Sequence, residues 1–152
     1  MAGFTKGMKS SNSNEWATPI ELFNELDREF HFTIDVASTH ENALCEKHYT
    51  KEENGLIQEW RGNVWLNPPY GREIKDWVRK AATDNPDGVT VVLVPARTDT
   101  AWWHDYVVNH ATEVRFIRGR LRFNDYGGGC APFPSAVVIY DKRPKNYWRV
   151  TR

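Results

Sequence analysis

Cysteine is scarce in this sequence: among 152 residues it occurs only at Cys45 and Cys130. Neither belongs to a C-x-x-C pair and no histidine follows at zinc-finger spacing, so we expect neither a structural zinc site nor a disulfide framework. No run approaches roughly 18 apolar residues, the length of a membrane span. The first twenty residues are polar and do not look like a secretory signal. These absences predict a cytoplasmic protein with free thiols and no membrane segment.

Aromatic side chains are abundant, with seven Trp, six Tyr and seven Phe in a chain of one-domain length. With a hydrophobic fraction of 40%, this composition is typical of an ordered globular domain. Residues 1–14, rich in Ser, Asn and Gly, lack periodicity, and we interpret them as a flexible arm. Residues 15–152 are predicted to form one compact domain.

Charge is balanced overall but not along the chain. Residues 115–152 contain nine Lys or Arg and two Asp, so this segment carries +7 and the remainder −7. A basic segment can bind a polyanion, because phosphate neutralisation with counterion release supplies much of nucleic-acid affinity. A solvated basic tail is the alternative, and charge alone does not choose between them.

Periodicity predicts alternating helices and strands. Helical spacing covers 19–29, 72–83, 99–109 and, weakly, 41–48. Strand patterns cover 31–37, 63–66, 89–94, 113–117 and 135–140. At the first helix we expect Thr18 as the N-cap and Pro19 at the first helical position. The order predicts an α/β domain with a mostly parallel sheet, helices on both faces and an antiparallel last strand.

Three polar clusters follow predicted strands, at Asp35, Asn67–Tyr70 and Pro95–Arg97. Ligands of such sheets bind beyond the carboxyl ends of the strands. The most informative cluster is Asn67-Pro68-Pro69-Tyr70, where two prolines end the strand and stiffen the backbone. They can hold the Asn67 amide and the Pro68 carbonyl as a pair of acceptors, which suits a planar amine bearing two hydrogens.

An amine held in this way can turn its lone pair out of conjugation and toward an electrophile, which is catalysis by orientation. Tyr70 would offer an aromatic face on which the heterocycle stacks. Such a motif is typical of amino-methyltransferases that use S-adenosylmethionine. The alternative is a rigid turn, with Asn67 as a cap and Tyr70 in the core.

Over nearly all of residues 14–140 the chain resembles the phage-type DNA N-6-adenine methyltransferase (Dam) family. The matching segments are 16–19 (WATP), 32–38 (FTIDVAS), 42–45 (NALC), 54–56 (NGL) with Trp60, 67–71 (NPPYG), 94–100 (VPARTDT), 115–121 (RFIRGRL) and 132–136 (PFPSA). Several motifs in the same order are far more specific than one.

The resemblance implies a Rossmann-like methyltransferase that transfers a methyl group from S-adenosylmethionine to the exocyclic N-6 amine of adenine in double-stranded DNA. Asn67, Pro68, Pro69 and Tyr70 match its catalytic motif. The cofactor-binding positions that it implies are Trp16, Thr18, Pro19, Asp35, Ala37, Ser38 and Asn54. No metal is needed, since the methyl donor brings its own leaving group.

One departure from the wider methyltransferase pattern concerns glycine. The usual glycine-rich loop is missing after the first strand, so Ala37 and Ser38 must manage the close backbone approach that glycine permits. A carboxylate for the ribose hydroxyls is not identifiable, and Glu46 is a candidate.

Adenine inside a duplex must be flipped out to reach the cofactor. The residues expected to contact DNA are Arg118, Arg120, Arg122 and Tyr126, with Lys142 and Arg143 as further phosphate contacts. No segment is long enough for a separate target-recognition domain, so recognition falls to loop 119–134, to the arm or to a second subunit of a homodimer. The resemblance suggests a phage enzyme, monomeric or dimeric, that marks DNA in the host cytoplasm, as protection from host nucleases.

Two other kinds of function stay open. The same Asn-Pro-Pro-Tyr device could serve cytosine, an RNA guanine or a protein glutamine. The chain could also be a catalytically inactive DNA-binding module on a methyltransferase fold. A transfer assay across these substrates separates the first group, and cofactor binding without turnover would indicate the second.

Overall fold

A computed structural model describes residues 16–123, 129–145 and 147–151. The helical elements are α1 (Ile20–Phe30), the 3-10 turn η1 (Gly55–Ile57), α2 (Ile74–Thr83) and the π-helix η2 (Trp103–Val108). The strands are β1 (Ile34–Asp35), β2 (Asn63–Leu66), β3 (Val89–Pro95), β4 (Glu113–Ile117), β5 (Ser135–Tyr140) and β6 (Tyr147–Thr151). The predicted arm, residues 1–14, lies outside the described residues, and among those described no helix is long and apolar enough to cross a membrane.

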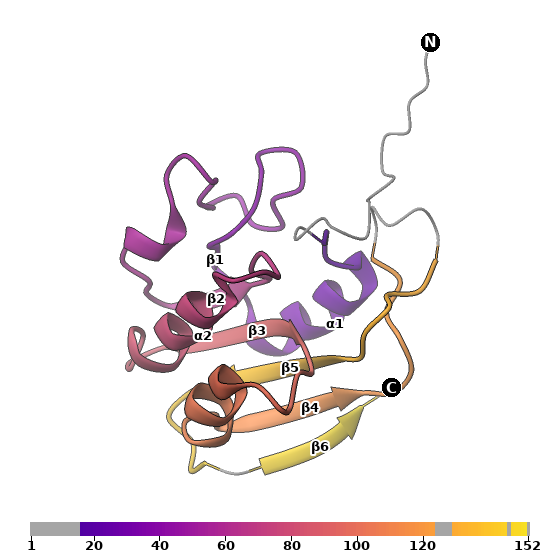
Figure 1. Ribbon diagram of the computed structural model, residues 1–152. Coiled ribbons are helices and arrows are strands. Elements are labelled where there is room, and N and C mark those ends of the chain that lie inside the picture. The colour runs from indigo at the N-terminus through magenta and orange to yellow at the C-terminus, as the bar shows by residue number, and fades with distance from the viewer. Residues whose placement is uncertain (1–15, 124–128, 146, 152) are drawn as a thin grey trace.

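The six strands form one mixed sheet in the order β1-β2-β3-β5-β4-β6 (Figure 1). Strands β1, β2 and β3 are parallel, and β5 lies antiparallel between β3 and β4. The predicted antiparallel pairing of 135–140 is therefore confirmed. That strand is not the last one, however, because β6 follows it and pairs parallel with β4. The sequence pattern missed β6 because its five residues follow a run of charged and turn-forming residues.

Three local predictions differ from the structure, two of them near the amino end. The strand expected over 31–37 is limited to Ile34–Asp35. The hydrogen bond from the Val36 N–H to the Trp65 carbonyl follows this strand, and beyond it the chain diverges from β2. The weak helical pattern over 41–48 forms turns and bends instead, tied back to β1 by the bridge between Asp35 and His48. The helix predicted over 99–109 is π-helical from Trp103 to Val108.

The first helix begins one residue later than predicted, and Thr18 does not cap it. Pro19 occupies the N-cap position of α1, and no side-chain hydrogen bond caps the helix there. The Thr18 hydroxyl is instead hydrogen-bonded to Asn67, 49 positions away in sequence. A residue that looked like a local helix signal is thus engaged in a long-range contact.

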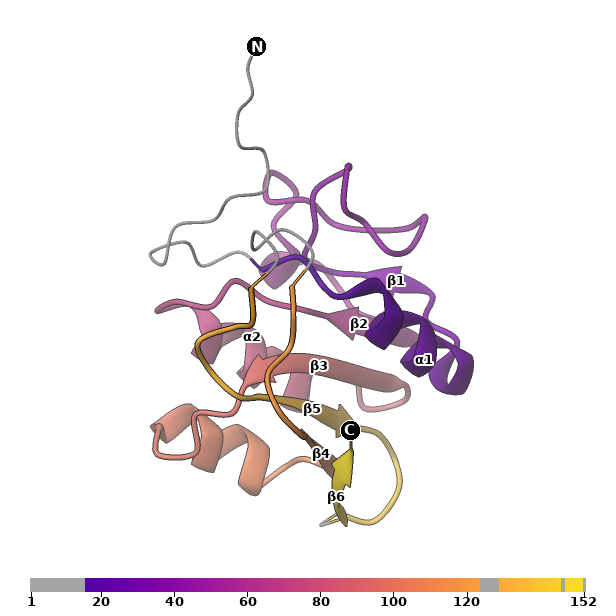
Figure 2. The ribbon, with the colours of Figure 1, turned by 90° about the vertical axis from the view of Figure 1, so that its right-hand side faces the viewer.

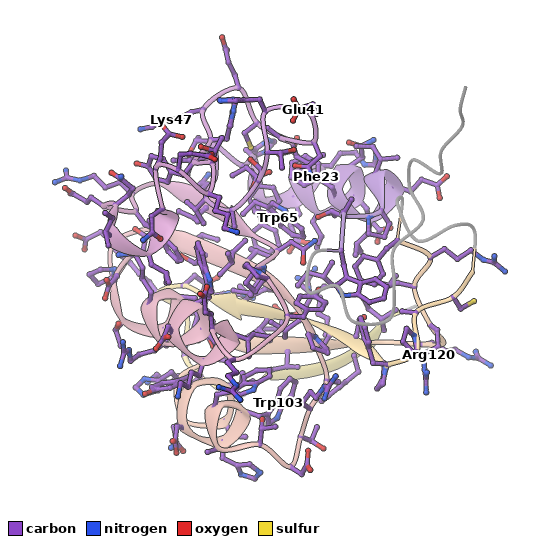
Figure 3. All side chains as sticks on the ribbon, turned by 45° about the horizontal axis from the view of Figure 1, so that its top comes forward. Phe23, Glu41, Lys47, Trp65, Trp103 and Arg120 are labelled. Carbon is purple, nitrogen blue, oxygen red and sulfur yellow. The ribbon has the colours of Figure 1, made fainter. Side chains whose placement is uncertain are left out.

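Alternate residues of the central strands enter two hydrophobic clusters. Val91 and Leu93 of β3 pack in a cluster with Trp65 and with Phe23 and Leu26 of α1. The neighbouring β3 residues enter the other cluster, which includes Trp77 of α2 and Trp103 of the π-helix. Figure 2 shows α1 on the side of the sheet opposite to α2 and the π-helix, and Figure 3 shows Phe23 and Trp65 close together.

Part of the basic segment serves the fold. Arg115 of β4 donates to both carboxylate oxygens of Glu29 at 2.8 Å and to the fully buried Glu113 at 2.7 Å. Arg143 pairs with Glu113 and Asp141, and Lys142 lies 3.9 Å from Asp87. Two arginines counted in the +7 segment are therefore neutralised within the protein, and the role predicted for Arg143 on phosphate competes with two carboxylates.

Candidate functional site

A cavity of about 1010 Å³ lies where β1 and β2 end. Its walls come from the chain before α1, the loop after β1, the η1 turn and the loop after β2. Nine of the predicted site residues line it: Trp16, Thr18, Asp35, Ala37, Ser38, Asn54, Asn67, Pro68 and Pro69. Segments that are distant in sequence are thus brought together as the predicted parallel sheet requires. Pro19 and Tyr70 are not among the lining residues.

Asn67 has a defined orientation in this cavity. Its Nδ2 donates to the Trp16 carbonyl at 2.5 Å and to the Thr18 hydroxyl at 2.9 Å. Its Oδ1 is buried and accepts no hydrogen bond among the described residues. A buried acceptor without a partner is unfavourable in a folded protein. The arrangement therefore fits an acceptor that is kept for a ligand.

Three more cavity-lining residues carry buried polar atoms without a partner, namely Ser38 Oγ, Trp65 Nε1 and Trp77 Nε1. Only one other such side-chain atom, Ser135 Oγ, occurs among the described residues. Sequence reasoning found Ser38 but missed the two tryptophans, whose apolar surroundings predicted core positions only. The concentration of unsatisfied polar atoms around one cavity indicates a polar ligand site.

Tyr70 lies next to the cavity but packs inward. Its ring contacts Phe123 and Phe133 edge-on, with centroid distances of 6.3 and 5.6 Å, and its hydroxyl donates to the Leu93 carbonyl at 3.1 Å. Burial holds the pKa of Tyr70 well above its usual range, so the hydroxyl stays a neutral donor. Tyr70 thus packs in the core, as the rigid-turn alternative expects, and it also follows Asn67 closely in the motif beside the cavity.

Asp35 at the end of β1 is 2% exposed. Its carboxylate accepts hydrogen bonds from the backbone N–H groups of Ala37 and Leu44, which shape the loop after the strand. Burial raises its pKa to about 6, although these hydrogen bonds and the nearby His48 act in the opposite direction. Asp35 therefore organises one cavity wall and is still protonated in part near neutral pH.

Gly55 is a residue whose role the sequence analysis missed. A Cβ atom at this position would lie 2.1 Å from the Val36 carbonyl oxygen and 3.1 Å from the Trp77 ring. The η1 turn therefore approaches the loop after β1 more closely than any side chain allows. Asn54 precedes it with φ 59°, and its Oδ1 accepts from the Leu56 N–H at 3.1 Å. The Asn-Gly pair, a turn signal, was the available clue.

The predicted DNA-contacting arginines lie at the same edge of the sheet as the cavity. Arg118, Arg120 and Arg122 are exposed and follow the carboxyl end of β4. The register aligns this end with that of β3, because Phe116 and Pro95 pair with the adjacent β5 residues Ala136 and Ser135. Figure 3 shows Arg120 at the periphery of the molecule. Tyr126 lies outside the described residues.

Another cation at the cavity was not predicted. Arg72 lies two residues after Tyr70, lines the cavity and is exposed. Glu73 beside it also lines the cavity, so the local charge is mixed. No pattern in the sequence distinguishes Arg72 from other surface arginines.

Comparison with known proteins confirms the family resemblance seen in the sequence. A family profile described as DNA N-6-adenine-methyltransferase (Dam) matches residues 6–138. A DNA N-6-adenine-methyltransferase of Escherichia phage T1 is 36% identical over 110 residues, which cover 70% of this chain and 45% of that protein.

A second relative, a DNA N-6-adenine-methyltransferase of Haemophilus phage HP1 (strain HP1c1), is 29% identical over 112 residues, covering 72% of this chain and 65% of that protein. A putative methyltransferase, YfdM, of Escherichia coli (strain K12) is 32% identical over 65 residues, 38% of this chain and 71% of that protein. The chain thus spans about half to two-thirds of the length of the two phage relatives.

Proposed function

Because the chain belongs to the DNA N-6-adenine-methyltransferase (Dam) family, we propose that it transfers a methyl group from S-adenosylmethionine to the N-6 amine of adenine in double-stranded DNA. The observation that carries this proposal is Asn67, whose NH₂ group donates to protein acceptors while its buried Oδ1 has no partner in the part of the chain that the structure describes. An amine substrate needs an acceptor at this place, and the fixed amide supplies it.

The residues around the cavity fit S-adenosylmethionine. The cavity, about 1010 Å³, is at the upper end of the range for small-molecule sites, which leaves space for a methyl donor and a flipped base together. The residues proposed to hold the donor are Trp16, Thr18, Pro19, Asp35, Ala37, Ser38 and Asn54. Ser38 Oγ and the indole N–H of Trp77 add polar atoms that lack partners within the described residues. When bound, S-adenosylmethionine supplies an electrophilic methyl group on a positively charged sulfur.

In the proposed reaction the protein acts on the adenine amine. Asn67 Oδ1 and the Pro68 carbonyl would accept hydrogen bonds from its two N–H groups, which would leave the nitrogen lone pair free to face the methyl group. Pro68 and Pro69 keep these two acceptors in fixed relation. Tyr70, fixed through its hydroxyl to Leu93 of β3, is proposed to stack against the flipped base.

The proposed fold is Rossmann-like, in one compact domain over 15–152 with helices covering both faces of the sheet. Support comes from parallel β1, β2 and β3 with a cavity at their carboxyl ends. The packing of α1 and of α2 in different hydrophobic clusters agrees with this proposal.

Duplex DNA is proposed to lie across the exposed arginines Arg118, Arg120 and Arg122, with Tyr126 on the same loop. These side chains would bind phosphates and position the duplex without reading its sequence. Their place at the same edge of the sheet as the cavity supports this orientation. We propose action in the cytoplasm of a host bacterium, as a monomer or homodimer, with target recognition by loops.

The test measures methyl transfer from labelled S-adenosylmethionine to unmethylated duplex DNA and identifies the modified base after digestion. Wild type is compared with Asn67→Ala and with Asn109→Ala, a matched change at an exposed position after the π-helix. We expect N-6-methyladenine from wild type and Asn109→Ala and at least a hundredfold less from Asn67→Ala, as for loss of a key transition-state contact (roughly 10² or more). Methylcytosine, or transfer only to RNA or protein, would refute adenine in DNA as the substrate. Binding of S-adenosylmethionine without any methyl transfer would refute the proposal that the chain is an enzyme.

A further inference from the structure

The orientation of Asn67 depends on a segment about fifty residues earlier in the chain. We propose that Thr18, together with the Trp16 carbonyl, is a positioning residue that keeps the Asn67 amide turned with its oxygen toward the substrate. This inference rests on the proposed function, and it gives Thr18 a role other than the cofactor contact that the family resemblance implies.

The two ends of an asparagine amide have nearly the same shape, so hydrogen-bond partners decide which end faces the substrate. A backbone carbonyl can only accept, and the Trp16 carbonyl lies 2.5 Å from Asn67 Nδ2. The Thr18 hydroxyl binds the same nitrogen at 2.9 Å. In the reversed orientation, oxygen would face the carbonyl and the NH₂ group would face an amine that needs acceptors. The Trp16 carbonyl therefore selects the orientation in which Oδ1 is available, and the Thr18 hydroxyl, which can donate or accept, adds a second hydrogen bond that holds the amide in that orientation.

The Thr18 side chain has no helix-capping role that would explain its burial. It is 7% exposed and directly precedes Pro19, the N-cap of α1, but α1 has no side-chain cap hydrogen bond. A buried hydroxyl costs free energy unless it is hydrogen-bonded. The contact with Asn67 supplies a bond and links the start of α1 to the end of β2.

The position of the Trp16 carbonyl is fixed by the loop that carries the arginines. The Trp16 ring contacts Phe123 and Phe133 edge-on, at centroid distances of 5.3 and 5.2 Å. The same two phenylalanines contact Tyr70. Figures 1 and 2 show the start of α1 close to the loop between β4 and β5. Phe123 and Phe133 thus pack against both Trp16, in the segment that orients Asn67, and Tyr70, the last residue of the proposed catalytic motif.

The experiment compares Thr18→Val, which removes the hydroxyl at similar volume, with Thr18→Ser, which retains it. Thr112→Val is the matched control, because Thr112 is also a buried threonine and its hydroxyl makes two hydrogen bonds with Asp141 at the opposite edge of the sheet. The measured quantities are kcat with duplex DNA, the Kd of S-adenosylmethionine and hydrogen exchange of the Asn67 side-chain NH₂ by NMR, assigned through its loss in Asn67→Ala.

For Thr18→Val we expect kcat to fall about tenfold, as for loss of correct orientation, with the Kd of S-adenosylmethionine changed less than about twofold. Exchange of the Asn67 NH₂ should accelerate about tenfold, since one of its two hydrogen bonds is lost. Thr18→Ser should restore all three quantities, and Thr112→Val should leave kcat and Asn67 exchange unchanged.

Weaker cofactor binding with unchanged kcat and unchanged Asn67 exchange would overturn the proposal and make Thr18 a cofactor contact. Unprotected Asn67 NH₂ protons in wild type would overturn it as well. Should wild type methylate no DNA, the proposed function fails, but the exchange measurement still decides whether Thr18 orients Asn67.

Discussion

Asp35→Asn tests whether the buried carboxyl at the end of β1 makes stability depend on pH. Burial raises the pKa of Asp35 from an ordinary 3.8 to about 6. As pH rises between these values, the unfolded chain loses this proton before the folded protein does, so the free energy of unfolding falls. Each pH unit of difference corresponds to about 1.36 kcal/mol, which gives about 3 kcal/mol in total.

The assay is urea unfolding of wild type and Asp35→Asn at several pH values from about 3.5 to about 7.5. Asparagine cannot ionise, so the wild type should lose about 3 kcal/mol relative to the variant across this range. The asparagine side chain cannot accept hydrogen bonds from both backbone N–H groups in the same way. This loss lowers the free energy of unfolding of the variant by an amount that does not depend on pH. Asp105→Asn, at an exposed position of the π-helix, controls for removal of a carboxylate. Parallel curves for wild type and Asp35→Asn would refute the reasoning.

We expect the same carboxyl to make the binding of S-adenosylmethionine depend on pH. If Asp35 accepts a hydrogen bond from the amino group of S-adenosylmethionine, binding must remove its proton below pH about 6. The affinity of wild type should then rise about tenfold per pH unit up to that point. Calorimetry should find no such rise in Asp35→Asn, and an equal rise in both proteins would contradict the assigned contact.

Three further predictions concern the cavity wall, the charge cluster and the basic loop. Gly55→Ala should destabilise the fold by about 1–3 kcal/mol through overpacking and weaken S-adenosylmethionine binding; unchanged calorimetric and unfolding data would contradict the 2.1 Å approach to Val36. Arg115→Met should cost about 3 kcal/mol in urea unfolding, because buried Glu113 loses a partner; a cost below about 1 kcal/mol would count against this. Arg118→Ala and Arg120→Ala should each lower the slope of log K for DNA against log salt by about 0.9; an unchanged slope would remove that arginine from the interface.

The sequence allowed prediction of the parts of the fold that depend on local periodicity. The apolar run of β3 and the amphipathic pattern of α2 lie where expected, because burial acts on each residue through its own side chain. The position of the cavity was also predictable. Asp35 and Asn67 stand at the carboxyl ends of two strands, and these ends share an edge in a parallel sheet.

Features that depend on long-range contacts were not predictable. Thr18-Pro19 has the pattern of a helix start, yet the Thr18 hydroxyl is hydrogen-bonded to Asn67, and no local pattern specifies that choice. The role of Gly55 depends on the Val36 carbonyl, and the π-helix over Trp103–Val108 follows an apolar spacing that also fits an α-helix. The charge pattern counts Arg115 and Arg143 among the residues that could bind a polyanion. In the structure Arg115 pairs with Glu29, and Arg143 pairs with Glu113 and Asp141.

The antiparallel insertion of β5 between β3 and β4 has a consequence for how such a protein can diversify. The connection from β4 to β5 begins and ends at the same edge of the sheet as the cavity. Phe123 and Phe133, one toward each end of this connection, are buried in a hydrophobic cluster. An exchange of residues between these anchors would leave the strand register intact. If this loop recognises DNA as proposed, we expect chimeras that carry this stretch from relatives to methylate different DNA sites while the residues around Asn67 stay the same.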